Sequence, residues 1–363
     1  MNDVARAAGA ASLFQVSGRL VHVVAHGEGL IHDSYRIDVE AADGRERYLL
    51  QRINRDVFGD VDGLMRNIAS VLDHLHASGD IGTGAYPALV ETVDGGAWLD
   101  YKGFAWRMMS YVEGSRSVDW SPSAHQAGEI GHAFGRFLKH LESFPVDTLS
   151  AVLPGYRDTR RYVNGFESAI AQDVRGRRRS IRSEIAWLED RRDAALALQT
   201  LWQSRQLPTR LIHGDTKLNN VLFDAGAERA LCAIDFDTVG RGLLLHDVGD
   251  CVRDLLAGTA AVRGRLTDDD VAIVEALLRG FMRGAGAPFA PLELAHLVDA
   301  ASSVTLELAI RFLTDYLEGD VYFRVCRKDE NLARARLHIA LAGLLESHRV
   351  HLDAAAQSAL KSV

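Results

Sequence analysis

The stretch from residue 210 to residue 237 constrains the fold more than any other part of the sequence. It reads RLIHGDTKLNNVLFDAGAERALCAIDFD. Two apolar runs, 221–223 and 231–234, flank a short polar segment that contains glycine. This pattern predicts an antiparallel β-hairpin, and a hairpin returns the chain to the place where it left.

Three polar side chains of this stretch, Asp215, Asn220 and Asp235, are therefore expected to meet at one end of the hairpin. The set suits phosphoryl transfer, in which a protein mainly positions reactants and neutralises charge. Asp215 would accept the proton of an attacking hydroxyl, and Asn220 and Asp235 would supply the oxygen ligands that Mg²⁺ prefers. The order H-x-D-x-x-x-x-N followed by I-D-F is that of a kinase catalytic loop and its metal-binding aspartate. The alternative is a tight turn with solvated acids, but four spaced elements agree on the kinase interpretation.

The segments HGDTKLNNVLFD, IDFDT and HDVGD resemble the aminoglycoside phosphotransferase and choline kinase superfamily. Within it, the chain is similar to the N-acetylhexosamine 1-kinase family over nearly its whole length, through YLLQR at 48–52, WRMMSYVEG at 106–114 and RFLTDYLEGD at 311–320. The resemblance implies an α+β, bilobal protein-kinase-like fold that uses ATP and Mg²⁺. It also implies phosphorylation of the anomeric hydroxyl of N-acetylglucosamine or N-acetylgalactosamine to the 1-phosphate.

Such a fold divides the chain into two lobes. We expect a small mixed β/α lobe for the nucleotide at 1–109 and a mainly helical lobe for catalysis and acceptor binding at 110–363. In the superfamily an aspartate at the position of Asp247 braces the catalytic loop, and Asp250 is a second candidate for that role.

The segment 20–39 predicts two strands joined by a turn with Gly27 and Gly29, followed by Ser34. Backbone N–H groups of a glycine hairpin can approach phosphate oxygens, although a plain hairpin between two strands has the same pattern.

At the crossing between the lobes, the backbone of Ser110, Tyr111 and Val112 would bind adenine. The apolar side chains of Met108, Met109 and Tyr111 are candidate walls of that site, although a core edge strand explains them without a ligand.

Ordinary kinases carry a lysine on the third strand that pairs with the nucleotide phosphates and with a helix glutamate. Here Gln51 holds the corresponding position, and the predicted helix 63–76 has no glutamate. Either an uncharged pair such as Gln51 with Asn67 replaces the ion pair, or Arg52 contacts the phosphates.

The predicted helix 307–322 places Arg311 and Asp315 on one face, with Tyr316 beside them. Arginine and carboxylate suit sugar hydroxyls and an aromatic ring suits a sugar face, so these residues are a candidate acceptor site. A buried ion pair with a packed tyrosine is the alternative. By resemblance, His32 and Asp33 also lie near the ligands.

The formal net charge of −8 argues against binding of nucleic acid or of an anionic membrane surface. Three widely separated cysteines are typical of free thiols in a reducing compartment, and no segment has the composition of a signal peptide or a membrane span. We therefore expect a cytoplasmic protein; the sequence leaves its oligomeric state open.

Two other functions remain open. One is a kinase of another small alcohol, such as an aminoglycoside, choline or homoserine, although Arg311 is an awkward neighbour for a cationic acceptor. The other is a nucleotide-binding regulator without catalysis, suggested by the glutamine at position 51.

Overall fold

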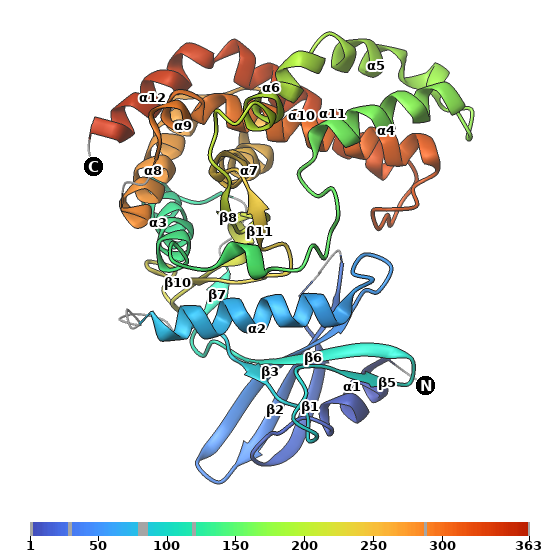
Figure 1. The fold of residues 1–363 in the computed structure, drawn as a ribbon, viewed down its shortest axis with the longest axis vertical. Helices are drawn as coiled ribbons and strands as arrows, with labels where there is room; N and C mark the ends of the chain where they lie inside the picture. Colours follow the sequence, from blue (N-terminus) through green and yellow to red (C-terminus); the bar gives the residue numbers. More distant parts are fainter. Residues whose placement is uncertain (1–2, 28–30, 79–85, 118–120, 287–288, 362–363) are drawn as a thin grey trace. The chain divides into compact units, whose positions relative to one another are not determined.

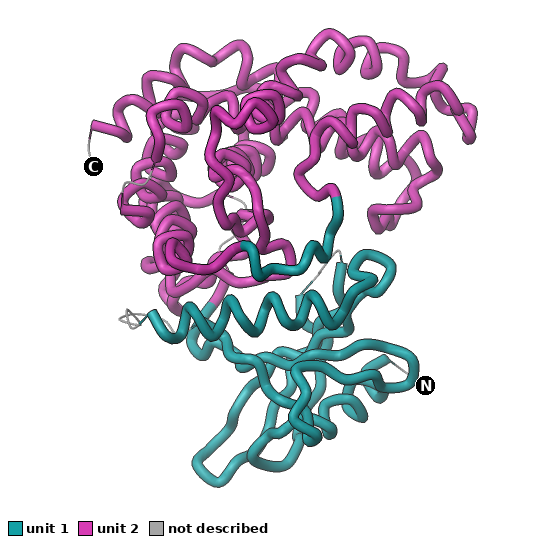
Figure 2. Tube along the Cα trace, in the orientation of Figure 1, with its two compact units in different colours: residues 1–115, 147–154 teal, residues 116–146, 155–363 magenta. Residues whose placement is uncertain are grey.

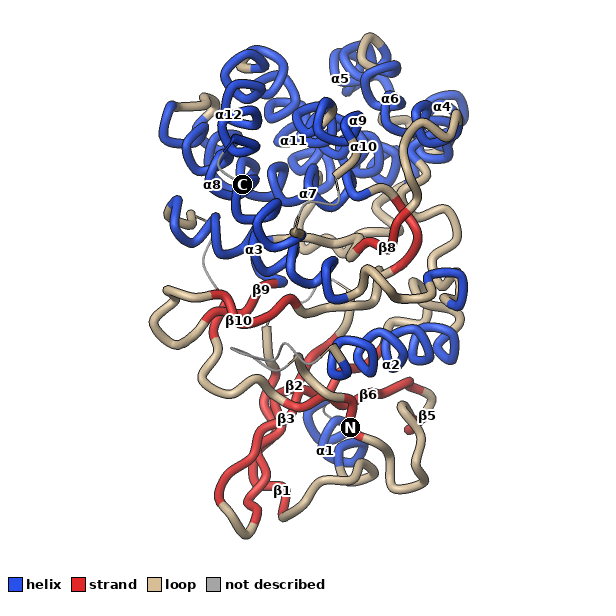
Figure 3. The backbone as a smooth tube through the Cα atoms, turned by 60° about the vertical axis from the view of Figure 1, so that its left-hand side comes forward, coloured by secondary structure: helices blue, strands red, loops and turns tan. Residues whose placement is uncertain are grey.

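The computed structural model describes residues 3–27, 31–78, 86–117, 121–286 and 289–361. The chain divides into two compact units, residues 1–115 with 147–154 and residues 116–146 with 155–363 (Figure 2). The first unit contains the main β-sheet, whereas helices dominate the second unit (Figure 3). This is the mixed α+β class that the sequence predicts.

The first unit is built on a sheet in the order β1-β2-β3-β6-β4, with β5 paired to β6 (Figure 1). Its elements are α1 (Asp3–Ala11), β1 (Arg19–Ala25), β2 (Asp33–Ala41), β3 (Gly44–Ile53), α2 (Val61–Ala77), β4 (Leu89–Val90), β5 (Leu99–Tyr101) and β6 (Phe104–Ser110). Strands β1 and β2 are antiparallel, so the hairpin predicted for 20–39 is confirmed.

The two faces of this sheet differ because side chains alternate along each strand. Helix α1 packs its alanines on one face, against a core that includes Tyr35, Leu50 and Trp106. The neighbouring residues Ser34 and Gln51 have the opposite parity and lie on the other face.

Residues 147–154 belong with the first unit because they are tied to α2. The Asn67 side chain donates to the Ser150 carbonyl and accepts from the Ser150 N–H, both at 2.9 Å. The boundary expected after residue 109 would place this segment with the helical lobe.

The second unit combines many helices with five short described strands. Its strands are β7 (Arg116–Ser117), β8 (Arg210–Ile212), β9 (Val221–Phe223), β10 (Ala230–Ala233) and β11 (Gly240–Gly242). Strands β9 and β10 form the predicted hairpin, and β7 pairs with β9 at its edge. Its α-helices are α3 (Ala124–His140), α4 (Thr159–Gln172), α5 (Arg182–Glu189), α6 (Arg192–Gln203), α7 (Leu244–Leu256), α8 (Asp268–Ala285), α9 (Pro291–Ala295), α10 (Leu297–Glu318), α11 (Glu330–Ser347) and α12 (Arg349–Lys361).

Helices α3 and α8 approach each other through glycines. A Cβ on Gly280 would lie 1.9 Å from the Gly128 carbonyl oxygen, and one on Gly131 would lie 2.0 Å from the Leu277 carbonyl oxygen. Any larger side chain at these positions would force the helices apart. None of the described helices combines the length and the apolar character that crossing a bilayer requires.

Candidate active site

The predicted catalytic loop begins where β8 ends, at His213, Gly214 and Asp215. Gly214 has φ +83°, and a Cβ there would lie 2.6 Å from the Thr238 carbonyl oxygen. Only glycine combines this backbone conformation with so close an approach. The loop geometry therefore depends on Gly214.

Asp247 on α7 fixes this loop through hydrogen bonds. Its fully buried carboxylate accepts hydrogen bonds from the N–H groups of His213 (2.7 Å) and Gly214 (2.8 Å), and its carbonyl accepts from the Thr216 hydroxyl (2.6 Å). Burial raises the pKa of Asp247 to about 7, although the two N–H donors act in the opposite direction. The predicted bracing role of Asp247 is confirmed.

Asp215 is contacted by two residues of its own loop. The Lys217 ammonium lies 2.7 Å from Oδ2, and the Asn220 side-chain amide donates to the Asp215 carbonyl (2.8 Å) and to Oδ2 (3.3 Å). Burial would lower the pKa of Lys217, but Asp215 and Asp235 outweigh it and raise that pKa. No hydrogen bond among the described residues uses Oδ1 of Asp215, which leaves this oxygen able to accept a proton.

The structure also brings Asn220 and Asp235 together. The Ile234 N–H donates to the Asn220 carbonyl (2.8 Å), which fixes the next residue, Asp235, beside the loop. Asp235 is exposed and has φ +69°, a strained backbone of the kind that concentrates at functional sites.

These two residues fit a magnesium ion. The Asn220 amide nitrogen faces Asp215, so its oxygen is the atom left for a ligand, and Asp235 offers a carboxylate. Among the described residues no group of three or more His, Cys, Asp and Glu could hold a metal. Mg²⁺ does not require one, because it commonly takes one or two protein ligands together with substrate phosphates.

A buried ion-pair cluster supports the loop from the helical side. Arg157 donates to the Gly214 carbonyl and to Asp250, each at 2.8 Å, and Arg253 contacts Asp250 at 2.7 Å. Burial alone would raise the pKa of Asp250, but Arg253 and Arg157 hold it below its usual value. Asp254 accepts from the Leu218 N–H (2.9 Å), so a second acid also braces the loop.

Arg311 on α10 lies in an aromatic cage, which we define by four rings. The guanidinium carbon is 4.7 Å from the ring centroid of Tyr162, 5.5 Å from that of Phe323, and 5.9 Å from those of Tyr156 and Tyr322. Arg311 is half-buried and makes no hydrogen bond or ion pair with any described residue. Its five N–H donors are therefore open to a ligand.

Tyr156 joins this aromatic cage to the catalytic loop. Its ring is part of the cage, and its hydroxyl donates to the Gly214 carbonyl at 2.6 Å. Arg311 and Asp215 are thus the two ends of one connected site.

The structure gives Asp315 and Tyr316 other roles, which corrects the prediction that they contact a sugar. The buried Asp315 carboxylate accepts from three successive N–H groups, those of residues 321–323, and from the Asn331 side chain. Tyr316 is buried in the helical core, with Arg177 over its ring at 4.5 Å. Asp315 thereby fixes the loop that carries Tyr322 and Phe323.

In the first unit, the residues predicted to bind the nucleotide lie on different faces of the sheet. Gln51 donates to the Ser34 hydroxyl (3.1 Å), and its carbonyl oxygen accepts from Arg107 (2.9 Å). Arg52 points to the α1 face, where it pairs with Asp33 and lies 4.8 Å from the Phe104 ring centroid. A phosphate contact by Arg52 and a ligand contact by Asp33 are therefore not supported.

The predicted pairing of Gln51 with Asn67 is wrong, because the Asn67 side chain is hydrogen-bonded to the Ser150 backbone.

His32 is buried against Phe58 and accepts a hydrogen bond from the Asn54 N–H at 3.0 Å. It therefore fixes the chain after β3, and we leave it out of the acceptor site. Gly27 has φ +71° and open space around it, whereas Gly29 falls outside the described residues.

The expected adenine-binding segment is partly engaged in the sheet. The Ser110 N–H donates to Ala88 (2.8 Å) and the Tyr111 N–H to Arg47 (3.1 Å). The Val112 N–H makes no hydrogen bond within the described part of the chain, so of the three backbone donors predicted to bind adenine it is the one that the sheet leaves unused.

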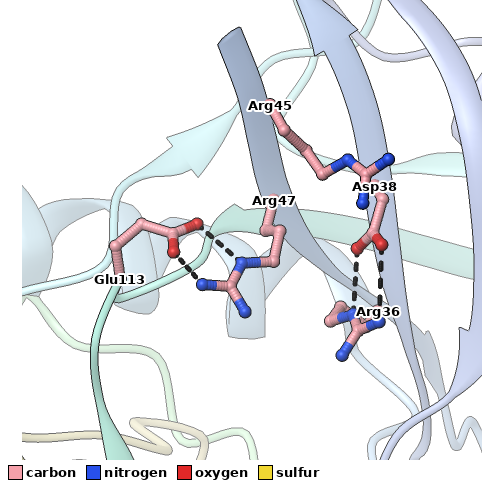
Figure 4. Close-up of a pocket in the computed structure, with 5 residues that line it drawn as sticks. All are labelled: Arg36, Asp38, Arg45, Arg47 and Glu113. Atoms are coloured by element: carbon pink, nitrogen blue, oxygen red, sulfur yellow. Dashed lines mark hydrogen bonds and ion pairs between the residues drawn. The ribbon is translucent and has the colours of Figure 1, made fainter. Parts of the chain in front are cut away.

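A cavity of about 300 Å³ lies on the Gln51 face, further toward the β2–β3 turn (Figure 4). Its arginines are largely neutralised, since Arg36 pairs with Asp38 (2.9 Å) and Arg47 pairs with Glu113.

Residues 22–281 match the phosphotransferase enzyme family known as APH. The chain belongs to the APH family. It is therefore a phosphotransferase of the small-molecule kinase type, and its protein-kinase-like fold agrees with solved structures. These include a microcompartment-associated aminopropanol kinase (18% identity, TM-score 0.63, 97% of this chain and 98% of the other).

Two further solved structures share the fold. An aminoglycoside phosphotransferase from Alicyclobacillus acidocaldarius has 14% identity and a TM-score of 0.60, with 98% of this chain and 96% of the other covered. An amicoumacin kinase in complex with AMP-PNP, Ca²⁺ and Ami has 14% identity and a TM-score of 0.61, with 94% of each chain covered.

Several site residues of this APH kinase are not among those predicted from the sequence. Lys217 lies two positions after Asp215, and that spacing could have signalled it. Tyr156 and Arg157 could not be found in this way, because their contacts with Gly214 join segments that are 58 and 57 residues apart.

Proposed function

We propose that this APH kinase transfers the γ-phosphoryl group of ATP to the anomeric hydroxyl of an N-acetylhexosamine, N-acetylglucosamine or N-acetylgalactosamine, to give the 1-phosphate. The observation that carries the proposal is Arg311, a half-buried cation with open donors inside an aromatic cage that Tyr156 connects to the catalytic loop.

The aromatic cage suits a neutral, hydroxylated acceptor. Guanidinium N–H groups donate to hydroxyl and amide oxygens, and the rings of Tyr162 and Tyr322 offer apolar surface to a sugar face. A cationic acceptor such as an aminoglycoside or choline would meet the like charge of Arg311, which favours an uncharged sugar.

Asp215 supplies the base. Its Oδ1 would accept the proton of the acceptor hydroxyl as the phosphoryl group leaves ATP, while Asn220 and Lys217 fix Oδ2. Lys217 also places a positive charge beside the reacting groups. Asn220 and Asp235 would hold Mg²⁺, which, when bound, neutralises phosphate oxygens.

Removing the charge of Arg311 tests the acceptor site. We expect Arg311→Met to raise KM for the N-acetylhexosamine by at least ~10-fold, because a charge-assisted contact contributes about 1.5–3 kcal/mol, while KM for ATP stays the same. Arg311→Lys keeps the charge but loses the planar donor set, so it should give an intermediate value. A wild-type acceptor KM in Arg311→Met would refute this assignment.

A further inference from the structure

The first unit contains a row of three polar residues on adjacent strands, which we call the polar row: Ser34 on β2, Gln51 on β3 and Arg107 on β6. Ser34 lies directly opposite Gln51, and Gln51 lies directly opposite Arg107. All three lie on the sheet face that α1 does not cover.

The hydrogen bonds of the polar row have a fixed direction. A guanidinium can only donate, so Arg107 must meet the carbonyl oxygen of Gln51 (Nε–Oε1 2.9 Å). The Gln51 amide nitrogen must then face Ser34 and donate to its Oγ (3.1 Å). The Ser34 hydroxyl hydrogen is left to point away from the sheet, toward an acceptor outside the row.

Ser34 also lies at the hairpin whose backbone is predicted to approach the nucleotide phosphates. Its carbonyl accepts from the His26 N–H (2.8 Å), which closes the hairpin just before Gly27. Ser34 is half-buried, whereas Arg107 is only 2% exposed. The hydroxyl is thus the accessible end of the polar row and the charge is its buried end.

Other arginines of the first unit are placed differently from the polar row. Arg52 is on the opposite face, and Arg36 and Arg47 line the cavity further toward the β2–β3 turn (Figure 4). A kinase still needs positive potential near the phosphates, and Gln51, at the position of the usual lysine, carries no charge.

We propose that Arg107 is a positioning residue for the nucleotide phosphates and replaces the usual lysine indirectly. Its guanidinium polarises the Gln51 amide, and the amide directs the Ser34 hydroxyl to donate to a phosphate oxygen, as in hydrogen-bond chains that strengthen one another. This inference rests on the proposed kinase function and assigns the phosphate-recognition part of it.

The test compares the affinities for AMP-PNP and for adenosine by calorimetry in the presence of Mg²⁺, because the polar row would act on phosphates alone. Gln51→Glu keeps a partner for Arg107 but turns the Ser34 hydroxyl inward and adds a negative charge. We expect AMP-PNP affinity to fall at least ~10-fold in Gln51→Glu and Ser34→Ala and by a smaller factor in Arg107→Met, because Arg107 acts only through the other two residues, with adenosine affinity unchanged in all three. Arg107→Lys should recover part of the loss.

Arg6→Met is the charge-matched control, since Arg6 pairs with Asp3 near Phe104 on the α1 side, and it should bind AMP-PNP as the wild type does. If Arg107→Met does not fold, Gln51→Glu and Ser34→Ala decide the matter. Unchanged AMP-PNP affinity in folded variants, or equal losses for AMP-PNP and adenosine, would overturn the role of the polar row. A wild-type protein that binds no AMP-PNP would instead overturn the kinase function on which it rests.

Discussion

The hydroxyl of Tyr156 donates a hydrogen bond of 2.6 Å to the carbonyl of Gly214, the residue before Asp215, which we propose as the base. The same ring lies 5.9 Å from the guanidinium of Arg311. One side chain therefore contacts both the catalytic loop and the proposed acceptor site. An acceptor bound to Arg311 would contact Tyr156 and, through the hydrogen bond of Tyr156 to Gly214, would affect the position of Asp215.

Replacing Tyr156 by phenylalanine removes the hydroxyl and keeps the ring of the aromatic cage. We expect kcat to fall ~5- to 10-fold, since a hydrogen bond contributes about 1 kcal/mol, with KM for ATP unchanged. Tyr101→Phe, which removes a hydroxyl on β5 of the first unit, is the control. Steady-state kinetics that gave Tyr156→Phe a wild-type kcat would show that the contact does not position the loop.

Asp215→Asn keeps the shape of the side chain but removes the base. General-base catalysis contributes ~10²- to 10⁴-fold, so we expect kcat to fall by about that factor while AMP-PNP affinity stays within a few-fold of the wild type. Rapid-quench measurement of phosphoryl transfer checks this. A variant that kept more than half of the wild-type kcat would exclude Asp215 as the base.

The glycine contact between α3 and α8 makes a stability prediction. In Gly280→Ala the new methyl group meets the Gly128 carbonyl at 1.9 Å, and we expect a loss of about 1–3 kcal/mol in the free energy of unfolding. Gly165→Ala is the matched control, because a Cβ there has no neighbour within 4 Å and α4 should gain about 0.5–1 kcal/mol. Urea unfolding of both variants gives the comparison, and equal effects would contradict the close contact.

Buried histidines should make stability depend on pH. Burial lowers the pKa of His338 to about 4, so the folded protein resists a proton that the unfolded chain accepts near pH 6.5. The folded state therefore loses stability as pH falls from 6.5 toward 4, by about 2 kcal/mol at pH 5 for this group.

His338→Leu isolates this contribution. The variant loses the hydrogen bond from His338 to the Arg334 carbonyl (2.8 Å) and should be less stable than the wild type at pH 7.5. At pH 5 the difference should shrink or reverse, because the variant has no proton penalty. A difference between the two proteins that is the same at both pH values would mean that His338 does not titrate as described.

The sequence predicts the second-unit hairpin and the meeting of Asp215, Asn220 and Asp235, because two short apolar runs around a turn that contains glycine determine both local structure and pairing. These residues are close in the chain, where local patterns carry most of the information. The brace at Asp247 spans 33 and 34 positions, and its prediction comes from the resemblance to the superfamily.

Other parts of the site could not be predicted in this way. Gln51 and Arg52 are neighbours, and only the register of the sheet decides which of them faces away from α1. Asp315 looks like a ligand residue by its helical spacing, but it binds the N–H groups of residues 321–323, a loop conformation that no short-range pattern specifies.

The most direct test of the central claim is acceptor-dependent ADP formation from ATP and Mg²⁺, followed by phosphorus NMR of the product. The acceptors are N-acetylglucosamine, N-acetylgalactosamine, unacetylated hexoses, choline, homoserine and an aminoglycoside. We predict the highest kcat/KM with an N-acetylhexosamine, an anomeric phosphate signal in the product, and loss of both in Asp215→Asn. Turnover of choline, homoserine or the aminoglycoside alone, or a phosphate at another sugar position, would contradict the account.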